Sequence, residues 1–104
     1  MTIESSGTID LIATNDENNT VTLAISDHLE WSDENKVDML AEKIDSYLYY
    51  IDSGQLIKAY PDAEGMTVNI LLKSMHKPNE MGSMIIDSIS ESLEEIDVKF
   101  ECEY

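Results

Sequence analysis

The stretch 37–51 constrains the fold most, because its apolar residues recur at spacings of three and four. Such spacing places side chains on one stripe of an α-helix. The stripe comprises Val37, Leu40, Ala41, Ile44, Leu48 and Ile51. Ser32 fits the N-cap, Asp33 and Glu34 fit the first turn, and Gly54 fits the residue that ends the helix. We therefore expect a helix of about 21 residues, roughly 30 Å long, packed through this stripe on the core.

Four further segments have the composition of β-strands, and three of them alternate apolar and polar residues. They are 8–13, 20–26, 66–73 and 96–104. Turn-forming residues at 14–19 would join the first two segments in a hairpin, and the turn 60–65 lies in the long connection 55–65. The alternation in the last strand places Ile96, Val98, Phe100, Cys102 and Tyr104 on one side and charged residues on the other.

A second helical pattern spans 78–95, with Pro78 suited to its first position. Its buried side is expected to comprise Met81, Ile85, Ile89 and Leu93. Gly82 lies within this helix, where glycine costs about 1 kcal/mol relative to alanine. We interpret Gly82 as a point of close packing.

The resulting order is β-β-α-β-α-β, and the charged side of the last strand indicates that part of the sheet faces water. We therefore predict an α+β fold, a two-layer sandwich with two helices on one face of a four-stranded mixed sheet. A chain of 104 residues is expected to form a single domain over 1–104, with 1–7 frayed. Any exposed edge strand is available for pairing with another chain.

The charge limits the partners of the protein. Twenty-two acidic residues outnumber six lysines, arginine is absent, and the net charge is −16. Such a charge repels nucleic-acid phosphates and anionic lipid, so we expect no nucleic-acid and no membrane partner. No apolar run approaches the ~18 residues of a membrane helix, and a single cysteine favours a reducing, cytoplasmic setting. The charge fits either solubility alone or a basic protein partner.

Three segments carry a resemblance to a known family. They are "ISDHLEW" at the end of the second strand, "YIDSG" at the end of the long helix, and "YPDAEG" in the following turn. The chain resembles, from Asp10 to Tyr104, a family of small uncharacterised bacterial proteins, a domain of unknown function. The resemblance implies a bacterial cytosolic protein and brings no activity with it.

Polar residues gather where the strands pass into the helices, which is where ligands often bind in β-α units. His28 and His76 follow the second and third strands, and both would lie at one edge of the sheet if those strands are parallel neighbours. With Asp27 or Glu30 they could bind zinc, iron or manganese and support a metal-dependent or acid–base enzyme. The alternative is a turn histidine beside acids that complement a helix N-terminus. We favour the alternative, because the sequence has no H-E-x-x-H motif and no cysteine pair. Cys102 lies on the inward side of the last strand and fits a buried structural thiol.

The outer side of the long helix predicts a binding surface. Met39 and Tyr50 lie opposite the apolar stripe, with Tyr49 outside it, Tyr47 on its flank, and Lys36 and Lys43 beside them. Trp31 is either a hydrophobic plug at the strand–helix corner or an anchor for a partner. The predicted partner-binding residues are Met39, Tyr47, Tyr49, Tyr50 and Trp31, although scattered exposed apolar residues are also ordinary.

These features favour a non-enzymatic interaction protein that uses no cofactor and acts through the helix surface, an exposed sheet edge, or both. Two kinds of partner are compatible with the sequence. One is a second copy of the chain in a symmetric dimer. The other is a basic protein, with an immunity-type or inhibitor protein as one example.

Overall fold

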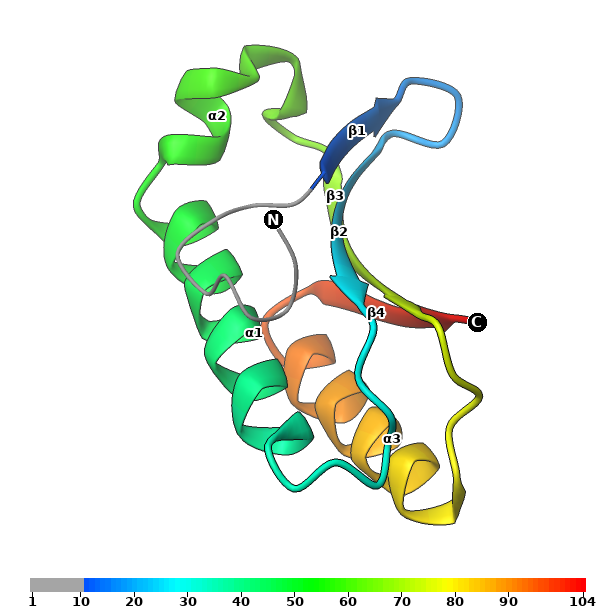
Figure 1. Cartoon of the computed structure of the whole chain (residues 1–104). Coiled ribbons are helices and arrows are strands. Elements are labelled where there is room, and N and C mark those ends of the chain that lie inside the picture. Colours follow the sequence, from blue (N-terminus) through cyan, green and yellow to red (C-terminus); the bar gives the residue numbers. More distant parts are fainter. Residues whose placement is uncertain (1–10) are drawn as a thin grey trace.

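The computed structural model describes residues 11–104 (Figure 1), so the expected fraying of 1–7 and the start of the first strand lie outside the described residues. The sheet begins with a hairpin of β1 (Leu11–Asn15) and β2 (Thr20–Asp27), paired antiparallel. β3 (Thr67–Ser74) and β4 (Val98–Glu103) continue it. The strand order is β1-β2-β3-β4, and β3 runs parallel to both of its neighbours. The predicted four-stranded mixed sheet is confirmed.

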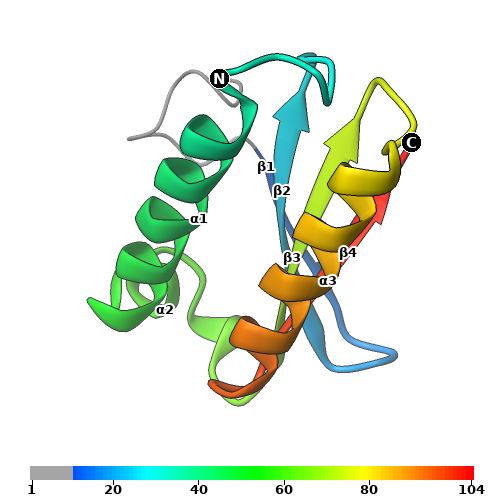
Figure 2. The same ribbon diagram turned by 90° about the horizontal axis from the view of Figure 1, so that it is seen from below.

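Two long helices cover one face of this sheet. They are α1 (Lys36–Asp52), between β2 and β3, and α3 (Glu80–Glu94), between β3 and β4. Because successive strands advance in the same direction across the sheet, crossovers of one hand place both helices on the same side. Figure 2 shows α1 and α3 side by side in front of the strands. The α+β two-layer arrangement is therefore confirmed.

The connection after α1 is more regular than expected. Gly54 adopts a positive φ of 83° and ends α1, as predicted. The segment that follows forms the short helix α2 (Gln55–Ala59) and the 3₁₀ helix η1 (Pro61–Ala63), in place of an irregular loop with one turn. Leu56 of α2 and Ala63 of η1 are buried in the core. This tertiary packing stabilises α2, which is too short to show a periodic hydrophobic pattern in the sequence.

Both long helices begin later than the sequence indicated. The expected N-cap at Ser32 was wrong, because α1 starts at Lys36 with Asn35 as its N-cap. The side chain of Asp33 instead accepts a hydrogen bond from the backbone N–H of Asn35 at 2.8 Å, which favours a turn there. α3 starts at Glu80, two residues after Pro78, and its N-cap Asn79 accepts from the backbone N–H of Gly82 at 2.7 Å.

The core lies between the sheet and the helices. Its strand residues are buried and alternate as predicted; they include Val21, Leu23, Ile25, Ile70, Leu72 and Phe100. Asp27 continues the same inward alternation at the end of β2, and only 2% of its surface is exposed. A carboxylate at such a depth requires a compensating partner.

That partner is Lys36, the first residue of α1. Its ammonium group forms a fully buried ion pair with the carboxylate of Asp27. It also donates to the backbone carbonyl of Leu29 at 2.9 Å and lies 4.0 Å from the ring centroid of Trp31. The other carboxylate oxygen of Asp27 accepts from the N–H of Leu29 at 3.0 Å. Every charge in this cluster is therefore paired or hydrogen-bonded, as burial demands.

This ion pair sets the orientation of α1 about its axis. The buried residues of α1 are Lys36, Leu40, Lys43, Ile44 and Tyr47. Leu40 and Ile44 belong to the predicted stripe, but Val37 is 48% exposed and Ala41 is exposed as well. The predicted exposure of Lys36 and Lys43 was wrong, because both lysines face inward and turn the aliphatic flank of the helix away from the sheet.

Three other expected core positions, Met81, Ile96 and Tyr104, also lie at the surface. Met81 is exposed on α3, and Ile96 is exposed in the turn before β4. The hydrophobic pattern continued one step beyond the packed part of each element, and there the core offers no neighbour to cover the side chain.

Removing one member of the buried pair tests its structural weight. Asp27→Ala leaves the ammonium of Lys36 buried without its counter-charge, and we expect the free energy of unfolding to fall by about 3–5 kcal/mol. The double substitution Asp27→Leu/Lys36→Met removes both charges and is expected to recover most of that loss. Chemical denaturation of the three proteins measures the difference. A loss below about 1 kcal/mol in Asp27→Ala would contradict a buried pair.

Candidate functional site

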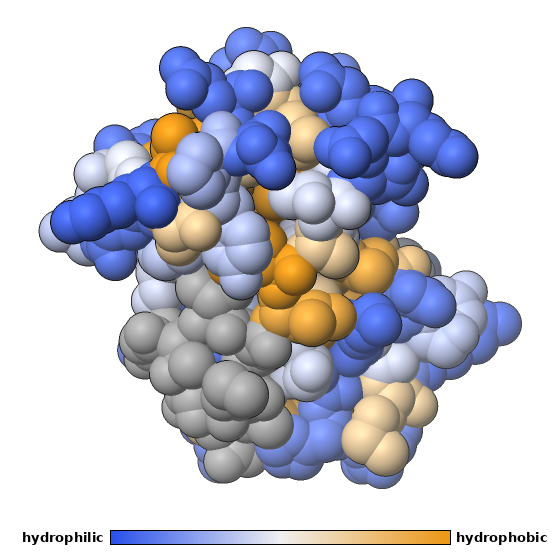
Figure 3. Space-filling model, turned by 90° about the horizontal axis from the view of Figure 1, so that it is seen from above, coloured by the Kyte–Doolittle hydropathy of each residue, from blue (hydrophilic) through white to orange (hydrophobic). Residues whose placement is uncertain are grey.

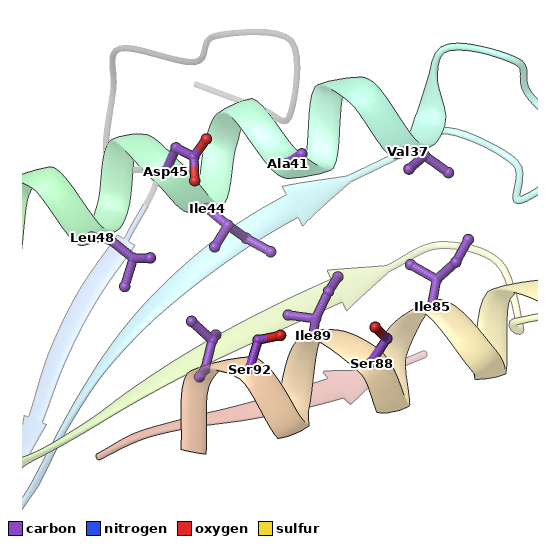
Figure 4. A pocket seen from close by; sticks show the side chains of 10 residues that line it. Val37, Ala41, Ile44, Asp45, Leu48, Ile85, Ser88, Ile89 and Ser92 are labelled. Carbon is purple, nitrogen blue, oxygen red and sulfur yellow. The ribbon is translucent and has the colours of Figure 1, made fainter. Parts of the chain in front are cut away.

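An apolar groove runs between α1 and α3. It encloses about 420 Å³, and the aliphatic side chains of the two helices point into it from both sides (Figure 4). We call it the α1–α3 groove. Its lining residues are Val37, Ala41, Ile44, Asp45, Leu48, Ile85, Ser88, Ile89, Ser92 and Leu93.

The groove follows directly from the orientation of α1. Val37, Ala41 and Leu48 were expected to pack on the sheet, but the inward-facing lysines turn this flank toward α3. Ile44 and Leu93 are buried and close the bottom of the groove, where they join the core. The small residues Ala41, Ser88 and Ser92 fill little of the space between the helices, which leaves it open.

Acidic residues are exposed on both helices, but Asp45 of α1 is the one acid among the lining residues of the groove. α1 exposes Asp38, Glu42, Asp45 and Asp52, and α3 exposes Glu80, Asp87, Glu91 and Glu94. No lysine offsets them, because α3 contains none and both lysines of α1 are buried. Asp38 and Asp52 share the side of α1 that carries Asp45, so negative charge runs along the α1 border of the groove. On α3, Asp87 and Glu94 lie instead beside residues of β4 and its ends, away from the groove.

Two exposed methionines extend the apolar surface beyond the groove. Met81 and Met84 are each 68% exposed. Each lies four residues before a lining residue of α3, Ile85 or Ser88, and so shares its side of the helix. Methionine side chains adapt to irregular partners, which makes this end of the groove suited to contact.

The predicted aromatic binding surface does not form as expected. Tyr47 is fully buried, and its hydroxyl donates to the backbone carbonyl of Ala24 in β2. Met39 and Tyr50 pack half-buried against the core, and burial, followed by the nearby Tyr60, raises the pKa of the Tyr50 hydroxyl. Of the four predicted residues on α1, Tyr49 alone is largely exposed, at 69%. The orientation of α1 explains this outcome, because the side of the helix that was predicted to face solvent partly faces the core.

The position of Trp31 matches the hydrophobic plug, which is one of the two roles that the sequence allowed. Its indole N–H donates to the backbone carbonyl of His76 at 3.1 Å, which links the β2–α1 and β3–α3 connections. Its ring stands under the ammonium of Lys36 and against the backbone of Gly82. A Cβ atom at Gly82 would lie 2.8 Å from the ring, so the expected close packing at Gly82 is present and Trp31 is its cause.

The two histidines follow parallel neighbouring strands, since Asp27 of β2 pairs with Ser74 of β3. They therefore lie at the same edge of the sheet, as the sequence indicated. The proposed ligands do not form a metal site, however: within residues 11–104, no three or more His, Cys, Asp and Glu side chains are placed to hold an ion. The carboxylate of Asp27 is held by Lys36, and Glu30 is exposed.

Cys102 shows no sign of activation as a nucleophile. The thiol is partly buried against the core, and this desolvation raises its pKa; Lys36 lowers it and Asp27 raises it by smaller amounts. A raised pKa keeps the thiol protonated at neutral pH, and the protonated form is a poor nucleophile. The sequence predicted a buried thiol, whereas Cys102 is only half-buried.

Substitution of Gly82 tests the plug. Gly82→Ala gains about 1 kcal/mol of helix propensity, but its Cβ must displace the Trp31 ring. We expect the free energy of unfolding to fall by about 1–3 kcal/mol from overpacking. Ser83→Ala, at the exposed neighbouring position, serves as the control and should change it by less than about 0.5 kcal/mol. Thermal or chemical denaturation measures the change in the free energy of unfolding. An increase in Gly82→Ala would show that the Trp31 ring is not held against Gly82.

Among the helices of residues 11–104, none combines the length and apolar composition that a membrane span requires.

Comparison with known proteins places the chain by family alone. No curated protein and no solved structure matches the chain at a significant level. The model of a family of unknown function matches residues 1–104, in agreement with the resemblance to a domain of unknown function. The chain therefore belongs to the family of unknown function DUF6572.

Proposed function

We propose that this protein is a non-enzymatic interaction module whose α1–α3 groove binds a positively charged segment of a partner protein. One observation supports the proposal above all. The groove combines an apolar floor with a row of exposed aspartates along its α1 border, and no lysine is among its lining residues. Apolar surfaces of this kind on soluble proteins mark interaction sites when polar residues border them.

The two components of the surface contribute in different ways. Burial of the aliphatic lining, such as the half-exposed Val37, contributes affinity at roughly 25 cal/mol per Å² before the costs of association. The acids attract a basic partner during diffusion and make association weaker at high salt. Figure 3 views the molecule from the direction opposite to Figure 2, and among the coloured residues of that face hydrophilic ones surround a central group of hydrophobic ones; the α1–α3 groove lies on the other side.

A basic partner fits better than a second copy of the chain. Two copies would each bring a net charge of −16, and in a symmetric contact through the groove the acidic borders would face each other. Neutralisation of a basic toxin or enzyme in the bacterial cytoplasm, by an immunity-type or inhibitor protein, is one activity that agrees with this surface.

Affinity capture with matched variants tests the proposal. Ala41→Glu places a charged side chain on an exposed lining position of the groove. Ala59→Glu makes the same change at an exposed position of α2, outside the groove. We expect basic proteins captured from a bacterial lysate to be reduced at least about tenfold by Ala41→Glu, which corresponds to about 1.4 kcal/mol. The Ala59→Glu protein should capture as the unsubstituted chain does.

Salt adds a second readout to the same capture experiment. Recovery of the proteins whose capture is reduced by Ala41→Glu should fall as ionic strength rises from about 0.05 M to about 0.5 M, because charges separated by more than a Debye length become screened. Equal capture by both variants would contradict the proposal, as would capture that is indifferent to salt.

A further inference from the structure

We propose that the occupant of the α1–α3 groove is an amphipathic α-helix of the partner, about three turns long and rich in lysine or arginine. This inference rests on the proposed function and specifies the form of the ligand. The α1 side of the groove extends from Val37 to Leu48. At about 1.5 Å per residue this is roughly 17 Å, which is the length of about three helical turns.

The walls of the groove favour a helix over an extended strand. Both walls are built from side chains of helices, and the backbone groups within a helix are already hydrogen-bonded to one another. A strand needs unpaired backbone groups at a sheet edge, whereas a helix binds through apolar anchors at i, i+3, i+4 and i+7. Figure 4 shows Ile44 of α1 and Ile89 of α3 pointing toward each other across the groove, and anchors of that spacing would enter between them.

The middle of the groove is suited to the approach of a helix. Ala41 on α1 and Ser88 and Ser92 on α3 have small side chains, so a third helix can settle between the two longer rows of aliphatic residues. Met81 and Met84 offer further adaptable apolar surface at the N-terminal end of α3. A long, shallow apolar strip with this variation in side-chain size matches a helix better than a compact ligand.

The acids determine the charge of the helix that fits. Asp38, Asp45 and Asp52 are spaced by seven residues, which places them on nearly the same side of α1, along the outer border of the groove. The α3 border is uncharged where it lines the groove, with Ser88 and Ser92 exposed there, and Asp87 and Glu94 lie on the β4 side of α3. A helix lying in the groove meets the row of aspartates on its α1 flank, so the polar side of that helix facing α1 has to be basic.

Two other occupants fit less well. Small-molecule sites bury most of the ligand surface, whereas Val37, Ala41, Asp45, Ser88 and Ser92 are all exposed along this groove. A second copy of the chain would present its own acidic helices to an acidic border. The charge complementarity of the surface therefore selects a basic helix.

Two synthetic peptides of about 14 residues provide the test. Both contain the same numbers of leucine, lysine and alanine. In the first peptide the leucines recur at i, i+3, i+4 and i+7; in the second they are distributed around the helix. Each is titrated into the full chain by fluorescence anisotropy, and circular dichroism records helix formation. We expect the first peptide to become helical on binding and to bind at least about tenfold more tightly than the second.

The groove variants identify the binding site of the peptide. Ala41→Glu should weaken binding of the amphipathic peptide at least about tenfold, and Ala59→Glu should leave it unchanged. Equal binding of the two peptides, or equal binding to the two variants, would overturn the helical occupant. A native mass of twice the monomer that reverts to the monomer in Ala41→Glu would also overturn it, in favour of a second copy.

The peptide titration separates this inference from the proposed function. If capture of basic proteins depends on Ala41 but the peptides do not differ, a basic partner binds the groove in another form. The proposed function then holds and the helical occupant fails. If neither capture nor peptide binding depends on Ala41, both fail.

Discussion

The buried ion pair between Lys36 and Asp27 is the interaction on which the rest of the structure depends. Moving two charges from water into the protein interior costs more free energy than their attraction recovers, unless further contacts compensate. Here the carbonyl of Leu29 and the ring of Trp31 provide those contacts. Because Lys36 begins α1 and Asp27 ends β2, the pair fixes both where the helix starts and which side of it faces the sheet. The apolar groove beside α3 is a consequence of that orientation.

The segment 26–36 is therefore a structural corner with little chemistry of its own. Asp27 neutralises Lys36, Asp33 forms a turn with Asn35, and Trp31 packs against Gly82 of α3. The concentration of acids, a histidine and a tryptophan resembles a catalytic cluster in the sequence. In the structure Asp27 and Trp31 hold this corner in place, and Trp31 links it to the β3–α3 connection. The surface that we propose for binding is the groove between the helices.

Much of the fold could be predicted from the sequence, whereas the candidate site could not. The alternation of Val21, Leu23 and Ile25 identifies β2, and similar patterns identify the other strands and the layer order. The orientation of α1 escaped prediction because lysine was assigned to the solvent side, as it is in most proteins. One signal was available: Asp27 continues the inward alternation of β2, and a buried carboxylate requires a cation. Local pattern alone cannot identify that cation, since the pairing is tertiary.

The account predicts that the two lysines of α1 are inaccessible while the other four, Lys58, Lys73, Lys77 and Lys99, are exposed. Brief amine labelling of the native protein, followed by peptide mass spectrometry, measures this directly. Lys36 and Lys43 should remain unmodified while the four exposed lysines react, and all six should react after denaturation. Labelling of Lys36 and Lys43 in the native protein at the rate of the exposed lysines would contradict the orientation of α1, and with it the α1–α3 groove.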